Sequence, residues 1–178
     1  MKLTKLIVVC LACLAGVASA QSKTTQNLDE RYEGLSLYFY KNTLRMLNQK
    51  DDPDFDALIR NIEKMKFVMI SKTSSQFGKA EYKKLVSDYQ GEAFEAVMTS
   101  RHQGRNFDIY VKDKANSPLS TVVLVNDSTS LFVLDMIGTI DVSKASALFS
   151  SLDSSTDIGQ KIKNFMERKE EELEKKQN

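Results

Sequence analysis

The chain has 178 residues, of which 42% are hydrophobic and 28% charged, and its formal net charge is +1. This balance excludes a general attraction to nucleic acid or to an anionic membrane surface, so neither is predicted as a partner. Both cysteines, Cys10 and Cys13, stand in the first twenty residues. The rest of the chain therefore has no thiol for a disulfide or a thiolate zinc site.

Residues 1–20 have the parts of a secretory signal peptide. A start with two lysines precedes an apolar stretch of about 12 residues, which is too short to span a bilayer. Ala18-Ser19-Ala20 then forms an A-x-A cleavage site before the polar Gln21. We predict cleavage between Ala20 and Gln21, and export to the periplasm or the extracellular space.

Cys13 gives an alternative location, that of a membrane-anchored lipoprotein. It follows Leu11 and Ala12 as a lipid-attachment cysteine would, but Cys10 occupies the position where such sites usually carry an aliphatic residue. Lipidation of Cys13 is therefore the alternative to cleavage after Ala20. No transmembrane span is predicted in the mature chain under either reading.

The first half of the remaining chain predicts a leader, a strand and a helix. Residues 21–30 are polar and aperiodic and predict a flexible leader. The aromatic and apolar alternation of residues 35–40 predicts a strand, followed by a short helical turn. Asp52 and Pro53 are an N-cap and a first-turn proline for a helix that ends near Lys64 and Lys66. Its core-facing positions are Phe55, Leu58, Ile59, Ile62 and Met65.

The middle of the chain predicts a buried strand and a second helix. The apolar run 67–70 is typical of a strand that is covered on both faces and central in its sheet. Ser74 and Ser75 predict the cap of a helix that ends at Gly91. The core-facing positions of this helix are Tyr82, Leu85, Val86 and Tyr89.

Two hairpins and a helix follow. The first hairpin comprises residues 94–100 and 107–112 around the turn 103–106, and the second comprises residues 122–125 and 131–134 around the turn 126–129. Asp141 then caps a predicted helix whose core-facing positions are Ala145, Leu148, Phe149 and Leu152.

This order, βαβαββββα with a further C-terminal helix, predicts an α+β fold. We expect a mainly antiparallel sheet of about six strands backed by helices. The domain is predicted over residues 31–155, after the signal peptide 1–20 and the leader 21–30. Residues 156–178 are strongly charged and predict a protruding helix or tail.

Several packing patterns resemble those of a known family. Residues 35–47, 59–62, 67–71, 122–125 and 137–141 are similar to the domain of unknown function 4252 family, found among small exported proteins and lipoproteins of Bacteroidetes. The resemblance covers most of the mature chain. It implies no activity, no cofactor and no catalytic residue.

Polar candidates for a site are sparse. His102 is the only histidine and stands beside a hairpin turn, which favours a loop residue over a catalytic base or a metal ligand. The carboxylates that would supply oxygen ligands for calcium lack the glycine and the closing glutamate of an EF-hand, so helix capping explains them; they are Asp51, Asp52, Asp54 and Asp56. Gly138 predicts a bulge or a close backbone approach at a strand end.

Aromatic residues offer one further candidate. Tyr38, Phe39 and Tyr40 would form a ligand platform, which Tyr82, Tyr89 and Tyr110 would extend. Their strand and helix periodicity instead favours positions in the core or on the sheet surface.

Export without a catalytic motif predicts a non-enzymatic module of the cell envelope that binds another protein or a surface component, with residues 156–178 suited to a partner groove. The first alternative is a small-ligand or lipid binder with a cavity between helices and sheet, near Met65, Met69, Met98 and Met136. A carboxylate-based exported hydrolase is the third reading, because 24 acidic residues always permit a suitable pair. No catalytic residue, cofactor or metal is predicted.

Overall fold

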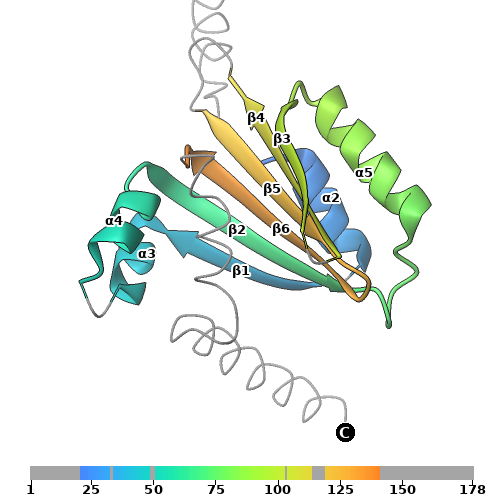
Figure 1. Ribbon diagram of the computed structural model, residues 1–178, viewed down its shortest axis with the longest axis horizontal. Coiled ribbons are helices and arrows are strands. Elements are labelled where there is room, and N and C mark those ends of the chain that lie inside the picture. The colour runs from blue at the N-terminus through green and yellow to red at the C-terminus, as the bar shows by residue number, and fades with distance from the viewer. Residues whose placement is uncertain (1–20, 33, 49–50, 103, 114–118, 141–178) are drawn as a thin grey trace, which may run out of the picture.

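The computed structural model describes residues 21–32, 34–48, 51–102, 104–113 and 119–140. Six antiparallel strands form one sheet in the order β1-β2-β6-β5-β4-β3, with α3 and α4 at one end and α2 and α5 at the other (Figure 1). The strands are β1 (Leu35–Tyr40), β2 (Ile62–Ser71), β3 (Glu95–His102), β4 (Arg105–Lys112), β5 (Ser120–Asn126) and β6 (Ser130–Gly138). The helices are α2 (Lys23–Tyr32), α3 (Lys41–Leu47), α4 (Pro53–Ile59) and α5 (Lys79–Gly91). The predicted α+β fold class is confirmed.

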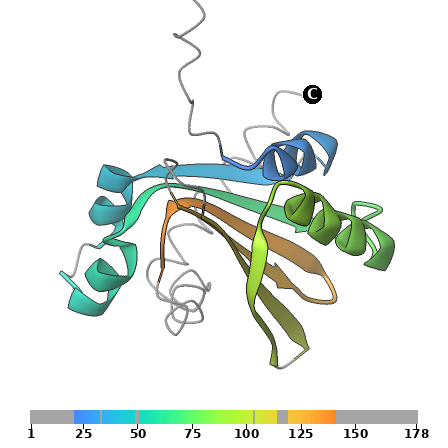
Figure 2. The same ribbon diagram turned by 90° about the horizontal axis from the view of Figure 1, so that it is seen from above.

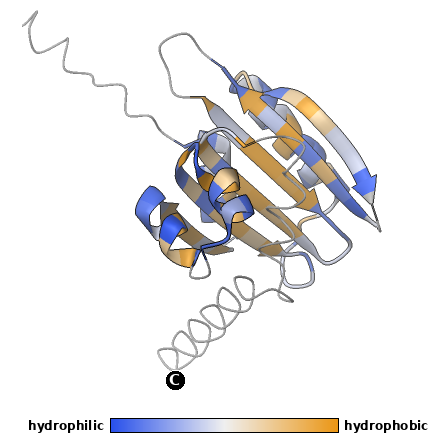
Figure 3. Ribbon diagram, turned by 60° about the vertical axis from the view of Figure 1, so that its left-hand side comes forward, coloured by the Kyte–Doolittle hydropathy of each residue, from blue (hydrophilic) through white to orange (hydrophobic). Residues whose placement is uncertain are grey.

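The central strands are hydrophobic along most of their length (Figure 3) because both faces of the sheet are covered there. All four residues of the run 122–125 in β5 are buried. β2 lies between β1 and β6, so residues 67–70 form an interior strand as expected, but one next to the edge strand β1 rather than at the centre of the sheet. In the turn between β5 and β6, the Asp127 carboxylate accepts hydrogen bonds from the backbone N–H groups of Thr129 and Ser130.

Each face of the sheet has its own hydrophobic core, and one pair of helices packs into each core (Figure 2). On one face, α3 and α4 pack on strand residues that include Leu37, Phe39, Met65, Phe67 and Leu134. On the other face, α2 and α5 pack on strand residues that include Val68, Ile70, Val122, Leu124 and Val133. The alternation of side chains along each strand separates the two sets.

The helix predicted to run to Met65 is wrong in its length, because α4 ends at Ile59 and β2 begins at Ile62. Residues from Ile62 onward form a strand despite their helical spacing, because they pair with β1 on one side and β6 on the other. A register shift between Ile62 and Lys64 lets Ile62 and Met65, three residues apart, point into the same core. The bulge therefore produces the three-residue apolar spacing that is typical of a helix. Lys64 and Lys66, predicted near the end of the helix, are strand residues.

The start of α4 is as predicted. The Asp52 carboxylate accepts hydrogen bonds from the backbone N–H groups of Asp54 at 2.9 Å and Phe55 at 3.3 Å, and Pro53 occupies the first turn. We expect Asp52→Ala to lower the free energy of unfolding by about 1 kcal/mol in urea titrations, because these donors lose their acceptor. Asp54→Ala is the matched control, since it keeps its backbone donor. Equal losses in the two variants would contradict this role.

The second helix begins later than predicted. Ser74 and Ser75 lie in the turn that follows β2, and α5 starts at Lys79. Its first turn is closed by the Glu81 carboxylate, which accepts a hydrogen bond from the backbone N–H of Gly78 at 2.9 Å. The cap is thus supplied from inside the helix rather than by a preceding serine.

The flexible leader predicted for residues 21–30 is wrong, because Lys23–Tyr32 is the helix α2 and its Thr24, Thr25 and Leu28 are buried. Packing on the sheet and on α5 supplies what its polar sequence lacks. The predicted signal peptide 1–20, the helix after Asp141 and the C-terminal helix 156–178 lie outside the described residues. In the described ranges no helix is long and apolar enough to cross a membrane.

Candidate functional site

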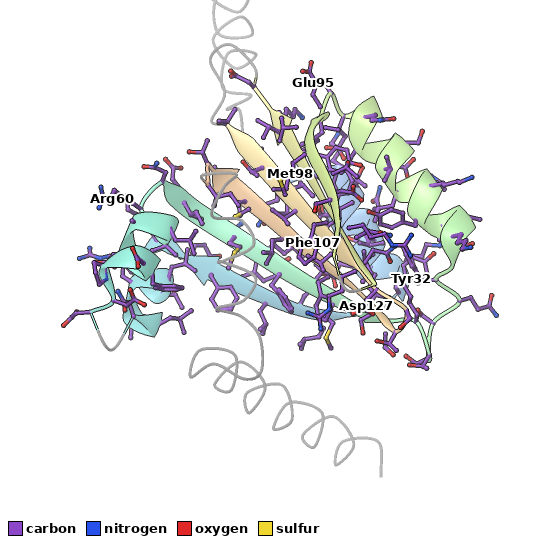
Figure 4. All side chains as sticks on the ribbon, in the orientation of Figure 1. Tyr32, Arg60, Glu95, Met98, Phe107 and Asp127 are labelled. Carbon is purple, nitrogen blue, oxygen red and sulfur yellow. The ribbon has the colours of Figure 1, made fainter. Side chains whose placement is uncertain are left out.

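α2 and α5 lie side by side on one face of the sheet and enclose a groove of about 360 Å³ between them. Its floor is apolar: Leu28 and Leu85 are buried, and the ring of Tyr32 packs edge-on against Phe77 with 5.2 Å between centroids. Tyr32 and Arg60 lie toward opposite ends of the molecule (Figure 4), so the groove is remote from α4. The other lining residues are Thr24, Asn27, Arg31, Ala80, Glu81, Lys84 and Asp88.

The rim of this groove carries two charges of each sign. Lys84 and Asp88 form an exposed ion pair at 2.6 Å on α5. The backbone N–H groups of Glu81 and Gly78 hold the pKa of the Glu81 carboxyl below its usual value, and Arg31 on α2 adds to this effect. An apolar floor between mixed charges suits an amphipathic segment better than a uniformly charged ligand.

The first turn of α2 is held by Glu92, which directly follows α5. Its carboxylate accepts hydrogen bonds from the Ser22 hydroxyl at 2.9 Å and from the backbone N–H groups of Thr24 at 2.5 Å and Lys23 at 3.2 Å. Burial raises the pKa of Glu92, but these hydrogen bonds outweigh it and the pKa is lowered. Glu92 is therefore an anionic cap for a helix that begins some 70 residues earlier in the chain.

Lys66 on β2 is only 3% exposed and forms an ion pair with Asp29 of α2 at 2.8 Å. Its ammonium also lies 5.2 Å from the ring centroid of Tyr38 on β1. Burial lowers the pKa of Lys66, but Asp29 and Tyr38 outweigh it and the pKa is raised. This ion pair fastens the middle of α2 to the sheet.

Asp135 on β6 is fully buried directly beside Lys66 in the strand register. One carboxylate oxygen, Oδ2, accepts a hydrogen bond from the backbone N–H of Ser22 at 2.9 Å. The other, Oδ1, has no hydrogen-bond partner among the described residues. Burial, reinforced by the nearby Glu92 carboxylate, raises the pKa of Asp135 to about 6 against the opposing effects of the Thr25 hydroxyl, the Ser22 backbone N–H and Lys66.

Two tyrosines of α5 complete this polar layer beneath the groove. The Tyr89 hydroxyl is hydrogen bonded to the Thr25 hydroxyl at 2.9 Å, and its ring stacks on Tyr110 of β4 at 6.2 Å. Tyr82 donates a hydrogen bond to the carboxylate of Asp108. Burial raises the pKa of both Tyr82 and Tyr89, so both phenols are protonated at neutral pH.

A comparison of the sequence with protein-family models decides the family. The model described as Domain of unknown function (DUF4252) matches residues 29–148. The chain belongs to the DUF4252 family. No curated protein and no solved structure matches it.

The DUF4252 match begins within α2. It includes Asp29, Lys66, Glu92 and Asp135, and it includes the whole of α5. The first turn of α2, with Ser22, precedes it. The carboxylates that hold the helix start thus belong to the family domain, while the donors that they hold lie just before it.

The predicted aromatic platform is not formed as a single surface. Tyr38 and Tyr40 are 48% and 56% exposed and flank Lys64, whereas Phe39 between them is buried in the opposite core. Tyr110 lies four strands away from Tyr38, roughly 19 Å at the usual strand spacing. The tyrosines of α5 accompany Tyr110 and do not extend the exposed pair.

The other predicted candidates are dispersed. Ala18, Ala20 and Cys13 lie outside the described residues, and Gln21 is the first residue described. His102 ends β3, and its side chain is outside the description. In the described part of the chain, no three histidine, cysteine, aspartate or glutamate side chains lie close enough to hold one metal ion. The methionines proposed for a ligand cavity lie in the core on the side of α3 and α4, away from the groove between α2 and α5: Met65, Met69, Met98 and Met136.

Sequence reasoning missed the buried charges of this DUF4252 domain. Lys66 and Asp135 each interrupt an apolar run, Met65–Ile70 and Leu131–Ile137, and a lone charge in such a run signals a paired or functional buried group. Glu92 gave no such signal, because a glutamate after a helix is ordinary. Only the folded chain brings it to the start of α2.

Proposed function

We propose that the protein is an exported, non-enzymatic binding module of the cell envelope, and that the groove between α2 and α5 receives an amphipathic segment of another envelope protein. The observation that carries this proposal is the groove itself, with its apolar floor of Leu28, Phe77 and Leu85 between charges of both signs. The signal-peptide pattern of residues 1–20 supports the location.

The form of the groove favours a protein segment. Helices that dock in such grooves insert a row of apolar side chains and place polar ones at the rim. The exposed Lys84–Asp88 pair and Arg31 offer partners for either charge on that segment. The ion pair of the buried Lys66 with Asp29 holds the α2 wall in place without the partner, so the free-energy cost of ordering this wall on binding is small.

A small-ligand binder is the second candidate, and the groove volume favours it. About 360 Å³ lies within the range of roughly 300–1,000 Å³ that is usual for ligand pockets. In this candidate the ligand binds between the helices α2 and α5, and not in the cavity between helices and sheet that the sequence predicted.

Filling the groove tests both candidates. Ala80, on the α5 wall, is exposed in the groove, and Ser87 is exposed on the same helix outside it. With a photo-crosslinking residue at Asn27, we expect Ala80→Trp to reduce crosslinked partner in native cells at least about tenfold, while Ser87→Trp leaves it unchanged.

Crosslinks that persist in Ala80→Trp would refute the groove as the partner site. Native mass spectrometry of protein from its own cells separates the second candidate: a bound small molecule that Ala80→Trp removes would favour a ligand pocket. Turnover in a panel of glycan and peptide substrates would contradict the non-enzymatic role.

A further inference from the structure

The residues after the predicted cleavage site are built into the fold. Ser22 is only 4% exposed, its backbone N–H donates to Asp135 at 2.9 Å, and its hydroxyl donates to Glu92 at 2.9 Å. Gln21, which would become the first residue, places its side-chain amide nitrogen in a buried position without a hydrogen-bond partner in the described part. The start of the mature chain is therefore fixed rather than free.

Negative charge is in excess around this start. The carboxylates of Asp29, Glu92 and Asp135 have Lys66 as a nearby cation: Lys66 pairs with Asp29, and both Lys66 and Glu92 act on the charge of Asp135. The Lys66 ammonium lies 2.8 Å from Asp29. In the described part, Asp135 Oδ1 is fully buried and makes no hydrogen bond of ordinary geometry, although the nearby Thr25 hydroxyl lowers the pKa of this carboxyl; such an arrangement costs free energy unless a charge compensates it.

We propose that the α-ammonium group of Gln21, released by cleavage after Ala20, is the cation that this site binds, with Asp135 as its carboxylate. This inference rests on the export in the proposed function. Consecutive backbone nitrogens lie within about 4 Å of each other, so the Gln21 nitrogen lies within about 7 Å of Asp135 Oδ2. The proposal requires that rotation about the backbone bonds of this one terminal residue lets the ammonium reach Oδ1.

The chemistry of cleavage creates the charge. Water adds across the Ala20–Gln21 amide bond, the Ala20 carboxylate leaves with the signal peptide, and the new amine takes up a proton near neutral pH. A neighbouring carboxylate favours the protonated amine. Processing would thus stabilise α2, which is one wall of the groove, and link removal of the signal to a finished binding site.

Cyclisation of Gln21 would oppose this. In that reaction the free amine attacks the side-chain amide carbonyl and ammonia leaves, giving a neutral lactam without the ammonium charge. A bound, protonated amine is not a nucleophile, so the site also protects the terminus.

The test compares exported proteins that differ only at the start. The native chain, verified by intact mass to begin at Gln21, is compared with a chain carrying two serines inserted between Ala20 and Gln21, which moves the amine away. We expect the native start to raise Tm at pH 7 by at least about 3 °C. The difference should vanish when both chains carry Asp135→Asn.

Two further forms separate charge from length. Gln21→Ala keeps the amine, cannot cyclise and should keep the higher Tm. Enzymatic cyclisation of Gln21 should lower Tm to that of the inserted chain and leave Gln21→Ala unaffected.

Equal Tm values for native and inserted starts, or a difference that persists with Asp135→Asn, would overturn the inference. An acylated start at Cys13 would also overturn it, because Gln21 would then keep its amide bond. The crosslinking from Asn27 is independent of these measurements, so a failure here and a failure of the groove are distinguishable.

Discussion

Gly138→Ala should lower the free energy of unfolding by about 3 kcal/mol, measured by urea titration at neutral pH. Gly138 ends β6 with a φ of 121°, a conformation that L side chains rarely adopt. A Cβ there would stand 1.9 Å from the Asn61 carbonyl oxygen and 3.1 Å from Ile62 Cα, both backbone atoms. The start of β2 must therefore shift, which disturbs the bulge that sets the register of Ile62 and Met65.

Gly91→Ala is the matched control. Gly91 is the last residue of α5, and a Cβ built on it meets nothing within 4 Å. Alanine is the better helix former, so we expect a change within about 1 kcal/mol, toward greater stability. Similar losses in the two variants would show that the close approach at Gly138 imposes no strain.

The second large effect is a pH dependence that comes from Asp135. With an amide bond before Gln21, the pKa of Asp135 is about 6 in the folded chain, against 3.8 as the ordinary value. The folded state then holds this proton more tightly than the unfolded state does, so stability falls as pH rises from about 4 through about 6. The loss amounts to about 3 kcal/mol by pH 7, at about 1.4 kcal/mol for each unit.

Asp135→Asn should remove this fall, because the amide stays neutral and still accepts from Ser22. The measurement is urea unfolding of both proteins, with the two-serine insertion, from pH 4 to pH 7.5. Glu92 has a lowered pKa and therefore acts in the opposite sense at lower pH, and Lys66 and Tyr89 stay protonated throughout; all of them are shared by the two proteins. Parallel pH profiles would show that Asp135 is not a buried, strained carboxylate.

These effects bear on the groove as well as on stability. α2 is held at its start by Glu92 and Asp135 and in its middle by Lys66, and each contact is polar. Such a wall is positioned by a few directed interactions in addition to the packing of Leu28 and Tyr32 in the core. Changes at its first turn are therefore expected to alter the width of the groove before they unfold the sheet.

Local signals in the sequence predicted much of this fold. The alternation in residues 107–112, the turn formers at 126–129 and the cap at Asp52 each act over a few residues, so they can be read without the rest of the chain. Gly138 belongs with them, because a lone glycine at a strand end indicates a close backbone approach, and the structure places the Asn61 carbonyl there.

The site depended on contacts between distant residues. α2 has one local cap, the Ser22 hydroxyl that accepts from the Thr25 backbone N–H at 3.3 Å, but its other polar contacts come from Glu92, Lys66 and Asp135, up to 113 residues away. β2 also depends on distant residues: its apolar spacing is that of a helix, and pairing with β1 and β6 makes it a strand with a bulge. The sequence by itself determined the elements whose hydrogen bonds and caps are local. Only the tertiary structure decided which charges are buried together and which helices face each other, because burial and pairing are properties of the packed chain.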